Sequence, residues 1–401
     1  MAPAYSNPIL PDVKDPPPLE VSFELTEIPS QHRALLLREL GKPLVLETRP
    51  TPKAGPGSVV VQIISVSIRS NSPEVFQDPN SGHPLPIPLV PGCMALGRVR
   101  EIGPDATRLK PGQLVFFHPY IIGRDDPGAK YVSGFMEVSN EGSKKLSRGE
   151  WRDSTLGEYA KLPLENCYPL DETRLLGDPK DSGLGYTLDD LTHLFSMLIP
   201  FGGLEDIDIK AGETVVIAPA TGRYGSGAVH SALALGARVI AIGPNADVLE
   251  QLSVINPGRL STVRITGDTD KDTEALRRTA GPAGVDAFWD MSPAAAGAST
   301  HFTTCLNVLK HGARVVLMGS VLDGVSFSYM DILGRGLTIK GTWMCTREQT
   351  RKLLRLVETG LLPLGQRAGM GPVRKFGLEQ WKQALDAAGE MIGHGEIVIT
   401  P

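Results

Sequence analysis

The sequence predicts an α/β protein in two parts, a compact β-rich domain followed by a doubly wound parallel sheet. From Arg33 to about Val99, short apolar runs alternate with turn residues such as Pro56-Gly57, which is typical of β-strands joined by tight turns. After about Asp189, strand-like segments alternate with helical ones, the order that builds a parallel sheet covered by helices. A chain of 401 residues is long enough for more than one such domain.

Residues 1–30 predict an N-terminal arm, because they are rich in proline and include Pro16-Pro17-Pro18. Proline fixes φ and removes a backbone donor, so we expect an extended segment, either packed on the body or left as a disordered tail. The segment lacks the basic and apolar stretches of a secretory signal, which makes the cytoplasm the expected location.

The β-rich domain is expected to cover residues 31–188. Its predicted strands lie in the segments ALLLREL, PLVLETR, SVVVQIISVSI, LGRVREI, LKPGQLVFF and TLGEYAKLP. Residues 123–153, between the last two segments, are rich in Gly, Ser, Lys and Glu and predict a long surface loop.

The composition excludes several classes of function. A formal net charge of −5 gives no basic surface for nucleic acid. The chain has no run of apolar residues long enough for a membrane helix. The four cysteines are far apart and form no zinc-finger or disulfide pattern, and Cys93 is interpreted as a small buried apolar residue. We therefore expect a small-molecule substrate rather than nucleic acid or a membrane.

The segment TVVIAPATGRYGSGAV predicts a turn that binds phosphate. A strand at Thr214–Ala218 leads directly into Gly222 and Gly225, and a helix follows. Glycine lets the backbone approach a pyrophosphate, and the start of the helix offers free N–H groups and a positive dipole end. An ordinary glycine-rich turn between strand and helix is the alternative. The residues predicted to bind the dinucleotide here are Ala220, Thr221, Gly222, Arg223, Tyr224 and Gly225.

This turn departs from the usual fingerprint at Pro219, where a glycine normally stands. Proline cannot adopt a positive φ, so the backbone must take a different path there. Tyr224 adds a ring and Arg223 a cation, and either side chain could touch the dinucleotide.

The end of the second strand favours NADPH over NADH. NAD sites place an acid there to bind the ribose 2′-hydroxyl, but the segment RVIAI is followed by Gly243-Pro244-Asn245, with no acid before Asp247. Gly243 and Asn245 are therefore predicted to contact the adenosine end. The cations near enough to bind a 2′-phosphate are Arg223 and Arg264.

The order of these domains resembles the medium-chain dehydrogenase/reductase superfamily, the alcohol dehydrogenase and quinone reductase group, over about residues 31–401. The segments that carry the resemblance are SVVVQIISVSIRSN, VPGCMALGRVREIG, LKPGQLVFF, AGETVVIAPATGRYGSGAV, ARVVLMGS and GEIVITP. The resemblance implies a GroES-like domain at 31–188, a Rossmann domain at 189–365 and a return to the first domain at 366–401. It also implies a homodimer that forms through the last Rossmann strands, around LTIKGTW.

Zinc-dependent members of the superfamily place a Cys in the stretch matching IRSN, a His-Glu pair in the stretch matching PGCM, and a third ligand before the Rossmann domain. Here these positions hold Arg69, Cys93-Met94 and the apolar segment MLIPFGG. Zinc needs thiolate, imidazole or carboxylate ligands, so no metal site is expected. The structural zinc site is not expected either, since residues 123–153 contain no cysteine.

Without a metal, hydride transfer depends on the orientation of the nicotinamide and on hydrogen-bond donors. The resemblance places Arg69, Ser70 and Asn71 opposite the nicotinamide, although Arg69 could instead form a structural ion pair. Tyr120 and His118 follow a strand and could supply an acid, or His118 could simply be packed.

Two further sites are considered near the cofactor, and the place of one further pair of residues stays open. The resemblance gives Gly319 and Ser320 backbone contacts with the carboxamide. Asp290 ends a strand and could face the cofactor or cap a helix. Trp343 and Met344 could belong to the pocket or to a subunit interface.

The leading hypothesis is a zinc-independent, NADPH-dependent reductase that reduces a C=C bond conjugated to a carbonyl in a small hydrophobic molecule. The second keeps the cofactor but makes the substrate an alcohol or ketone. The third is a non-redox binding protein or catalyst on the same scaffold, in which Tyr224 or Arg223 would block the nucleotide cleft.

Overall fold

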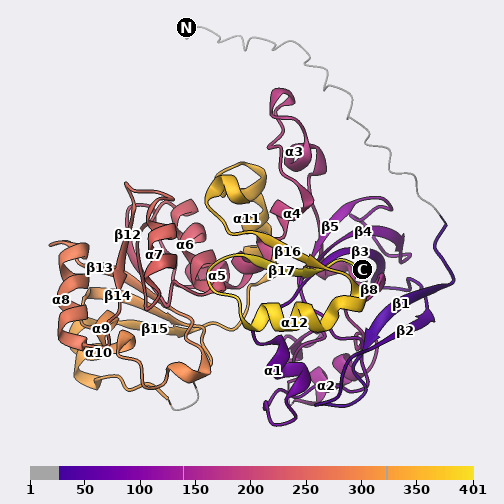
Figure 1. Ribbon diagram of the computed structural model, residues 1–401, viewed down its shortest axis with the longest axis horizontal. Helices are drawn as coiled ribbons and strands as arrows, with labels where there is room; N and C mark the ends of the chain where they lie inside the picture. Colours follow the sequence, from indigo (N-terminus) through magenta and orange to yellow (C-terminus); the bar gives the residue numbers. More distant parts are fainter. Residues whose placement is uncertain (1–26, 139, 322–323) are drawn as a thin grey trace, which may run out of the picture.

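The computed structural model describes residues 27–138, 140–321 and 324–401. Most of the predicted N-terminal arm at residues 1–30 lies outside these ranges. The described chain forms a β-rich domain and a parallel α/β domain side by side, as Figure 1 shows. The predicted fold class is therefore confirmed.

The β-rich domain is built on a seven-stranded sheet with the order β16-β17-β3-β4-β5-β9, and β8 pairs with β3 outside this path. Its central strand β3 is almost entirely buried, which suits its run of Val and Ile. The strands of this sheet are β3 (Ser58–Ser67), β4 (Ala95–Ile102), β5 (Leu114–Phe117), β8 (Tyr159–Pro163), β9 (Cys167–Pro169), β16 (Val373–Phe376) and β17 (Glu396–Ile399).

The last strand of the chain belongs to this first sheet. β17 runs antiparallel to β3, with Val398 opposite Ser67 and Ile399 opposite Val66. A separate antiparallel pair, β1 (Gln31–Leu36) and β2 (Val45–Pro50), adds to the same domain. Short helices complete it: α1 (Ser72–Gln77), α3 (Glu172–Leu176) and α12 (Trp381–Gly389).

The segment at 123–153 is more ordered than a surface loop, and that prediction was wrong. It contains β7 (Lys130–Val132), which pairs with β6 (Tyr120–Ile122), and the helix α2 (Glu141–Arg148). Asn140 caps this helix by accepting a hydrogen bond from Ser143 N. Ile121, Tyr131 and Trp151 form a small core beneath it. The composition of residues 123–153 is polar because this small core needs only a few apolar side chains.

The second domain holds a six-stranded parallel sheet in the order β12-β11-β10-β13-β14-β15. The first strand, β10, therefore lies in the middle of the sheet. β11 and β12 are added on one side of it and β13 to β15 on the other, as in a doubly wound fold. The strands are β10 (Thr214–Ala218), β11 (Arg238–Gly243), β12 (Leu260–Arg264), β13 (Val285–Asp290), β14 (Leu309–Leu317) and β15 (Thr338–Gly341).

Alternate residues of the strands enter two different cores. Val215 and Ile217 of β10 belong to the large core on one face of the sheet, whereas Val216 and Ala218 belong to a smaller core on the other. Both faces are thus covered, which explains why these strands are apolar throughout. The helices that follow the first domain are α4 (Leu188–Leu191), α5 (Leu194–Asp206), α6 (Arg223–Ala234), α7 (Ala246–Ser253), α8 (Thr269–Ala280), α9 (His301–Leu306), α10 (Tyr329–Arg335) and α11 (Arg347–Glu358).

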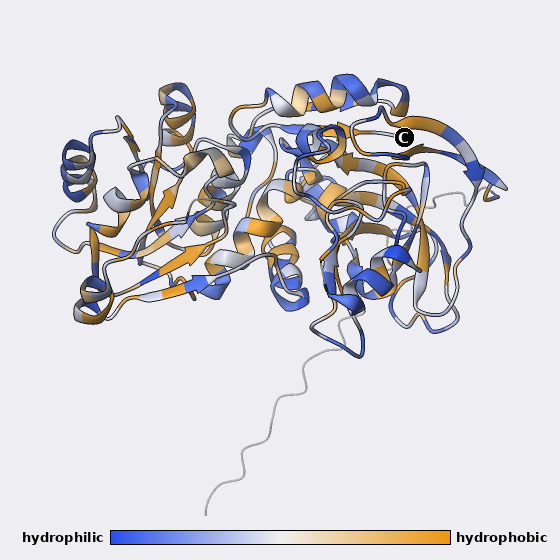
Figure 2. Ribbon diagram, turned by 90° about the horizontal axis from the view of Figure 1, so that it is seen from below, coloured by the Kyte–Doolittle hydropathy of each residue, from blue (hydrophilic) through white to orange (hydrophobic). Residues whose placement is uncertain are grey.

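Helix α5 is buried along nearly its whole length, because it packs against both domains. Its Phe195 stacks on Phe116 of β5, with ring centroids 6.1 Å apart. On its other side it packs closely on α6, where a Cβ at Gly227 would lie 2.2 Å from Ser196 O. Figure 2 shows apolar residues on the central strands and polar ones on the peripheral helices. No helix in the described ranges is long and apolar enough to cross a bilayer.

Candidate functional site

A cavity of about 720 Å³ lies between the two domains. The first domain contributes Arg69, Ser70 and Asn71, from the loop between β3 and α1. The second contributes the predicted phosphate turn, including Thr221 and Gly222. The structure therefore brings the predicted dinucleotide turn and the predicted substrate loop to one cavity.

The turn provides backbone groups that fit a pyrophosphate. Helix α6 begins at Arg223, and its first hydrogen bond runs from Ser226 N to Gly222 O, at 2.9 Å. Helix geometry therefore leaves the amides of Arg223, Tyr224 and Gly225 for a ligand, at the positive end of the helix dipole. A Cβ at Gly222 would meet no atom within 4 Å, so the approach to these amides is open.

Glycine is required at Gly225, the last residue of the turn, for a different reason. A Cβ at Gly225 would lie 1.9 Å from Pro219 O, so only glycine lets the helix start this close to the strand end. The Ala218–Pro219 peptide bond is cis, and Pro219 lines the cavity.

The end of β11 forms the far side of this cavity. Gly243 and Pro244 line it, and a Cβ at Gly243 would clash with Thr221 at 2.6 Å. Asn245 instead caps α7, since its side chain accepts a hydrogen bond from Val248 N at 3.1 Å. The exposed Arg264 donates from Nε to Pro244 O at 3.3 Å, which places its guanidinium at this strand end.

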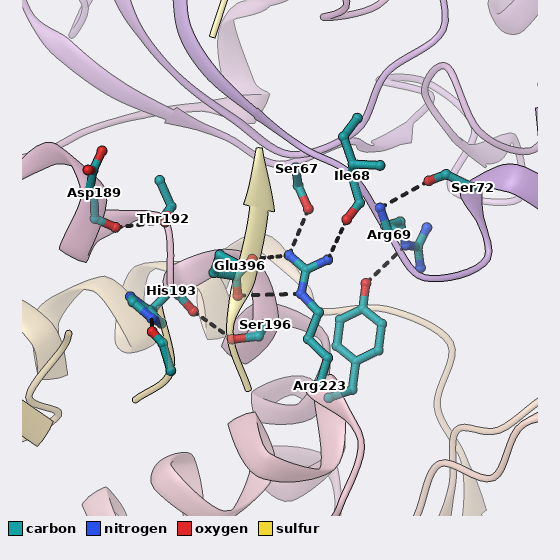
Figure 3. A network of polar contacts seen from close by, with 12 residues as sticks. Ser67, Ile68, Arg69, Ser72, Asp189, Thr192, His193, Ser196, Arg223 and Glu396 are labelled. Atoms are coloured by element: carbon teal, nitrogen blue, oxygen red, sulfur yellow. Dashed lines mark hydrogen bonds and ion pairs between the residues drawn. The ribbon is translucent and has the colours of Figure 1, made fainter. Parts of the chain in front are cut away.

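The side chain of Arg223 is directed to the first domain. Its guanidinium forms an ion pair with Glu396 of β17 and donates to Ile68 O at 3.0 Å and to Ser67 Oγ at 2.9 Å. Figure 3 shows these partners around it. The side chains of Arg223 and Glu396 are 4% and 0% exposed. Arg223 can therefore offer the dinucleotide its backbone amide, but its charge is already neutralised.

The side chain of Tyr224 turns toward Arg69. The Tyr224 hydroxyl accepts a hydrogen bond from Arg69 Nε at 2.9 Å. The Arg69 guanidinium also stacks on the Phe135 ring, 4.2 Å from its centroid, and interacts with the Cys93 thiol. The structural ion pair considered for Arg69 does not occur with any described carboxylate. The Arg223 side chain is bonded to Glu396 and the Tyr224 side chain to Arg69, and no atom beyond its chain neighbours lies within 4 Å of a Cβ at Gly222, which counts against a blocked nucleotide cleft.

Tyr120 and His118 are not among the described residues that line the cavity. Tyr120 packs edge-on against Trp343, which does line it, with centroids 5.4 Å apart. His118 is buried near Thr350 Oγ1, and burial together with nearby Arg347 lowers its pKa to about 3. His118 is therefore packed and neutral, as the alternative interpretation held.

A polar cluster that the sequence analysis missed lies beside the predicted nicotinamide end. Ser292 Oγ donates to Asp290 Oδ1 at 2.6 Å and lies 2.8 Å from His301 Nε2. His301 Nδ1 lies 2.6 Å from Ser299 Oγ. Ser292, Ser299 and His301 line the cavity, whereas the predicted Asp290 supports them from behind. The polar residues that follow an apolar strand were the signal available.

Gly319 and Ser320, which the resemblance assigns to the carboxamide, line the cavity next to this cluster. Ser320 N donates to Ser292 O at 2.9 Å. A Cβ at Gly319 would lie 2.4 Å from the same oxygen, so glycine permits the contact. Trp343 and Met344, left open between pocket and interface, both line the cavity.

The residues at the expected zinc positions do not fit a zinc ion. The first position holds Arg69, whose guanidinium cannot ligate a metal. The second holds Cys93, which could supply only one of the three protein ligands that a catalytic zinc needs. The third lies in the buried apolar helix α5. Within the described ranges, no group of three or more His, Cys, Asp and Glu side chains is arranged to hold a metal.

Two family models match the chain. The alcohol dehydrogenase GroES-like domain matches residues 55–172, and the zinc-binding dehydrogenase model matches residues 225–359. L-threonine 3-dehydrogenase of Anaeromyxobacter sp. (strain K) is 23% identical over 351 residues, covering 84% of this chain and 89% of that protein. The enzyme of the same name from Ruegeria pomeroyi is 24% identical and covers 84% of this chain and 91% of its own length.

Solved structures share the fold. A cobalt- and zinc-bound thermostable alcohol dehydrogenase from Pyrobaculum aerophilum has a TM-score of 0.67 at 21% identity and covers 92% of this chain and 100% of that one. A putative alcohol dehydrogenase from Sinorhizobium meliloti 1021 has a TM-score of 0.70 at 21% identity, with 93% and 98% covered.

The fold and the cavity are of the type that binds a dinucleotide between two domains, and the dehydrogenase relatives indicate an oxidoreductase that uses a nicotinamide cofactor. The family models and relatives then place the chain more closely. It belongs to the medium-chain dehydrogenase/reductase superfamily, as its sequence predicts.

Proposed function

We propose that this protein is a zinc-independent, NADPH-dependent reductase that acts on a C=C bond conjugated to a carbonyl in a small hydrophobic molecule. The observation that carries this proposal is the position of Arg69. It stands where zinc-dependent relatives have a metal ligand, and it is hydrogen-bonded to Tyr224 of the phosphate turn. A fixed cation in the cavity next to the cofactor turn can replace a metal as the group that stabilises developing negative charge.

The preference for NADPH rests on Arg264. A 2′-phosphate needs a cation and the absence of a nearby acid, and Arg264 lies at the end of β11, where no carboxylate stands among the described cavity-lining residues. Arg223, the other predicted cation, is neutralised by Glu396. Arg264 is therefore the residue that we assign to the 2′-phosphate.

When bound, NADPH supplies a hydride, which adds to the carbon β to the carbonyl. The displaced electron pair moves to the carbonyl oxygen, where Arg69 donates hydrogen bonds to the developing enolate. Asn71 and Ser70 lie in the same loop and offer further donors. The apolar side chains of Phe135, Met136 and Met344 exclude water and so strengthen these contacts.

A second candidate reaction is the reduction of a ketone, or the reverse oxidation of an alcohol, with the same cofactor and without zinc. It is favoured by the names of the relatives, which are threonine and alcohol dehydrogenases. Arg69 would then stabilise an alkoxide instead of an enolate. The two reactions differ in the carbon that receives the hydride.

The test is product analysis with NADPH deuterated at C4 of the nicotinamide and (E)-pent-3-en-2-one as the enone. Saturable quenching of protein fluorescence should first show that NADPH binds below about millimolar concentration, with NADH binding more weakly. Deuterium at C4 of the pentanone product supports the proposal. Deuterium on the carbinol carbon favours the ketone reductase, and no saturable binding of either cofactor contradicts both.

We also propose that two copies of the chain form a homodimer through the edge of the parallel sheet. β15 is the edge strand of that sheet, and α10 beside it exposes Tyr329, Met330 and Leu333. Exposed apolar side chains next to an open strand edge are suited to pairing with a second copy.

A further inference from the structure

We propose that the natural substrate carries a carboxylate directly beside its reducible carbonyl, and that Arg69 binds both groups. The substrate class is then a 2-oxo-3-enoic acid with a short apolar chain. This inference rests on the proposed function and specifies the substrate of the same site. It is drawn from the charge and the geometry of Arg69.

The charge of Arg69 lacks a carboxylate partner. Its contacts are all neutral: the Tyr224 hydroxyl, the Phe135 ring and the Cys93 thiol. No Asp or Glu occurs among the described residues that line the cavity. A half-buried cation without a counter-ion is unfavourable, and an anionic ligand would relieve that penalty.

Arg223 provides the contrast within the same protein. It lies next to Tyr224 in the chain, it is more deeply buried than Arg69, and it is neutralised by Glu396. Arg223, which links the two domains, thus has a carboxylate partner of its own. Arg69, which faces the cavity, has none, so its counter-ion is expected to arrive with the ligand.

The contacts of Arg69 also fix the direction of its hydrogen bonds. Nε is engaged by Tyr224, and the Phe135 ring holds the plane of the guanidinium. The terminal N–H groups that are not used by the Cys93 thiol form a planar fork, which matches two coplanar oxygens. A carboxylate oxygen and the adjacent keto oxygen of a 2-oxo acid present such a pair, whereas a simple enone presents one oxygen.

The apolar part of the cavity lining sets the character of the substrate's other end. Phe135, Met136, Trp343, Met344 and Met391 line the cavity and present apolar side chains. They fit a hydrocarbon chain extending from the anionic head. A substrate charged at both ends would leave its second charge without a partner here.

The reaction of such a substrate balances with NADPH alone. For (E)-2-oxopent-3-enoate, the hydride adds to C4, the C3=C4 pair shifts toward the keto oxygen, and C3 then takes a proton from water. The products are 2-oxopentanoate and NADP⁺. Arg69 neutralises both the existing carboxylate and the charge that develops on the keto oxygen.

The experiment compares kcat/KM for (E)-2-oxopent-3-enoate and for (E)-pent-3-en-2-one. The two compounds share the same enone, and a methyl group replaces the carboxylate in the second. We expect the wild-type protein to prefer the acid by at least about 30-fold, the value of an added charge-assisted pair. Arg69→Gln should reduce this preference to about threefold or less, and Arg69→Lys should leave an intermediate preference, because it keeps the charge but loses the fork.

Arg374→Gln is the matched control. Arg374 is exposed on β16 and also stacks on a phenylalanine, Phe376, at 5.6 Å, but it does not line the cavity. Its substitution should leave the preference as in the wild type. A second measurement avoids turnover: 2-oxopentanoate should raise the melting temperature of the protein–NADP⁺ complex, and Arg69→Gln should abolish this rise.

The outcomes separate the inference from the proposed function. Reduction of both compounds with equal kcat/KM, or a preference that survives in Arg69→Gln, would overturn the inference and leave the reductase intact. Failure to bind NADPH would overturn the proposed function, and the inference with it.

Discussion

The ion pair between Arg223 and Glu396 should be a main source of cohesion between the two domains. Both side chains are buried, and the pair joins the first turn of α6 to β17 and the end of β3. Glu396→Gln would leave the Arg223 charge without a buried counter-ion. Breaking one partner of a buried pair costs about 3–5 kcal/mol, so the free energy of unfolding should fall by that amount. Because α6 also carries the phosphate-binding amides, NADPH affinity should fall as well.

The assay is urea unfolding followed by tryptophan fluorescence, with NADPH affinity measured on the folded variants. Arg223→Met should destabilise to a similar extent, and the double variant Arg223→Met/Glu396→Leu should lose clearly less than the sum of the single losses. The control is Asp189→Asn, which breaks an exposed pair with Lys375 and should cost about 1 kcal/mol or less. A loss for Glu396→Gln no larger than that of this control would refute the reasoning.

Four further predictions follow from the structure. Arg264→Ala should lower the preference for NADPH over NADH by about tenfold or more in kcat/KM, because the 2′-phosphate loses its charge-assisted bond. Dialysis against a strong zinc chelator should leave the rate of NADPH oxidation unchanged. A loss of activity that zinc restores would contradict the conclusion that Arg69 and its neighbours do not fit a zinc ion. Burial lowers the pKa of His230 to about 3, with His394 and His193 adding to the effect, and burial lowers the pKa of His394 to about 4, with His193 adding to it. Their unfolded pKa is 6.5, so both are neutral when folded, and stability is full above pH 6.5 and is lost as pH falls toward 4, by about 1.4 kcal/mol per pH unit for each group. Urea midpoints between about pH 8 and pH 5 measure this slope, and a flat profile would contradict it. Met330→Glu with Leu333→Glu should convert a dimer to a monomer in light scattering after gel filtration, while an unchanged mass would exclude α10 as the interface.

The elements that could be predicted are those whose signal is local. The strand at Thr214–Ala218 is wholly apolar because both faces of the sheet are covered, and that alone separates it from a half-exposed strand. The turn after it was recognisable because close backbone approach can be met only by glycine, as the position of Gly225 confirms. A structural feature that depends on one residue, or on the regular spacing of apolar residues in one element, can be predicted directly from the sequence.

The sequence-based predictions that were wrong or incomplete concern features that depend on a distant partner or on only a few residues. Arg223 and Glu396 are 173 residues apart, so the turn sequence could not show that this arginine would be neutralised. The helix at Glu141–Arg148 is held by the Asn140 cap and a small core, a weak signal within a polar composition. Tyr120 was placed near the chemistry because it follows a strand, but it packs against Trp343, which lines the cavity, and is not itself among the lining residues.

The phosphate turn divides its work between backbone and side chains, and this changes how its sequence should be interpreted. Its amides face the cavity, while the side chains of Arg223 and Tyr224 point to the other domain. Arg223 is therefore no evidence for a 2′-phosphate, although a cation in such a turn suggests one. Tyr224 links the turn to Arg69, so any shift of α6 on binding the cofactor reaches the group that we assign to the substrate. Cofactor binding and substrate orientation are thus expected to be coupled through one hydrogen bond, and Tyr224→Phe should weaken that coupling while leaving the amides in place. Measuring the affinity for 2-oxopentanoate with and without NADP⁺ in this variant tests the link, and equal enhancement by NADP⁺ in variant and wild type would disprove it.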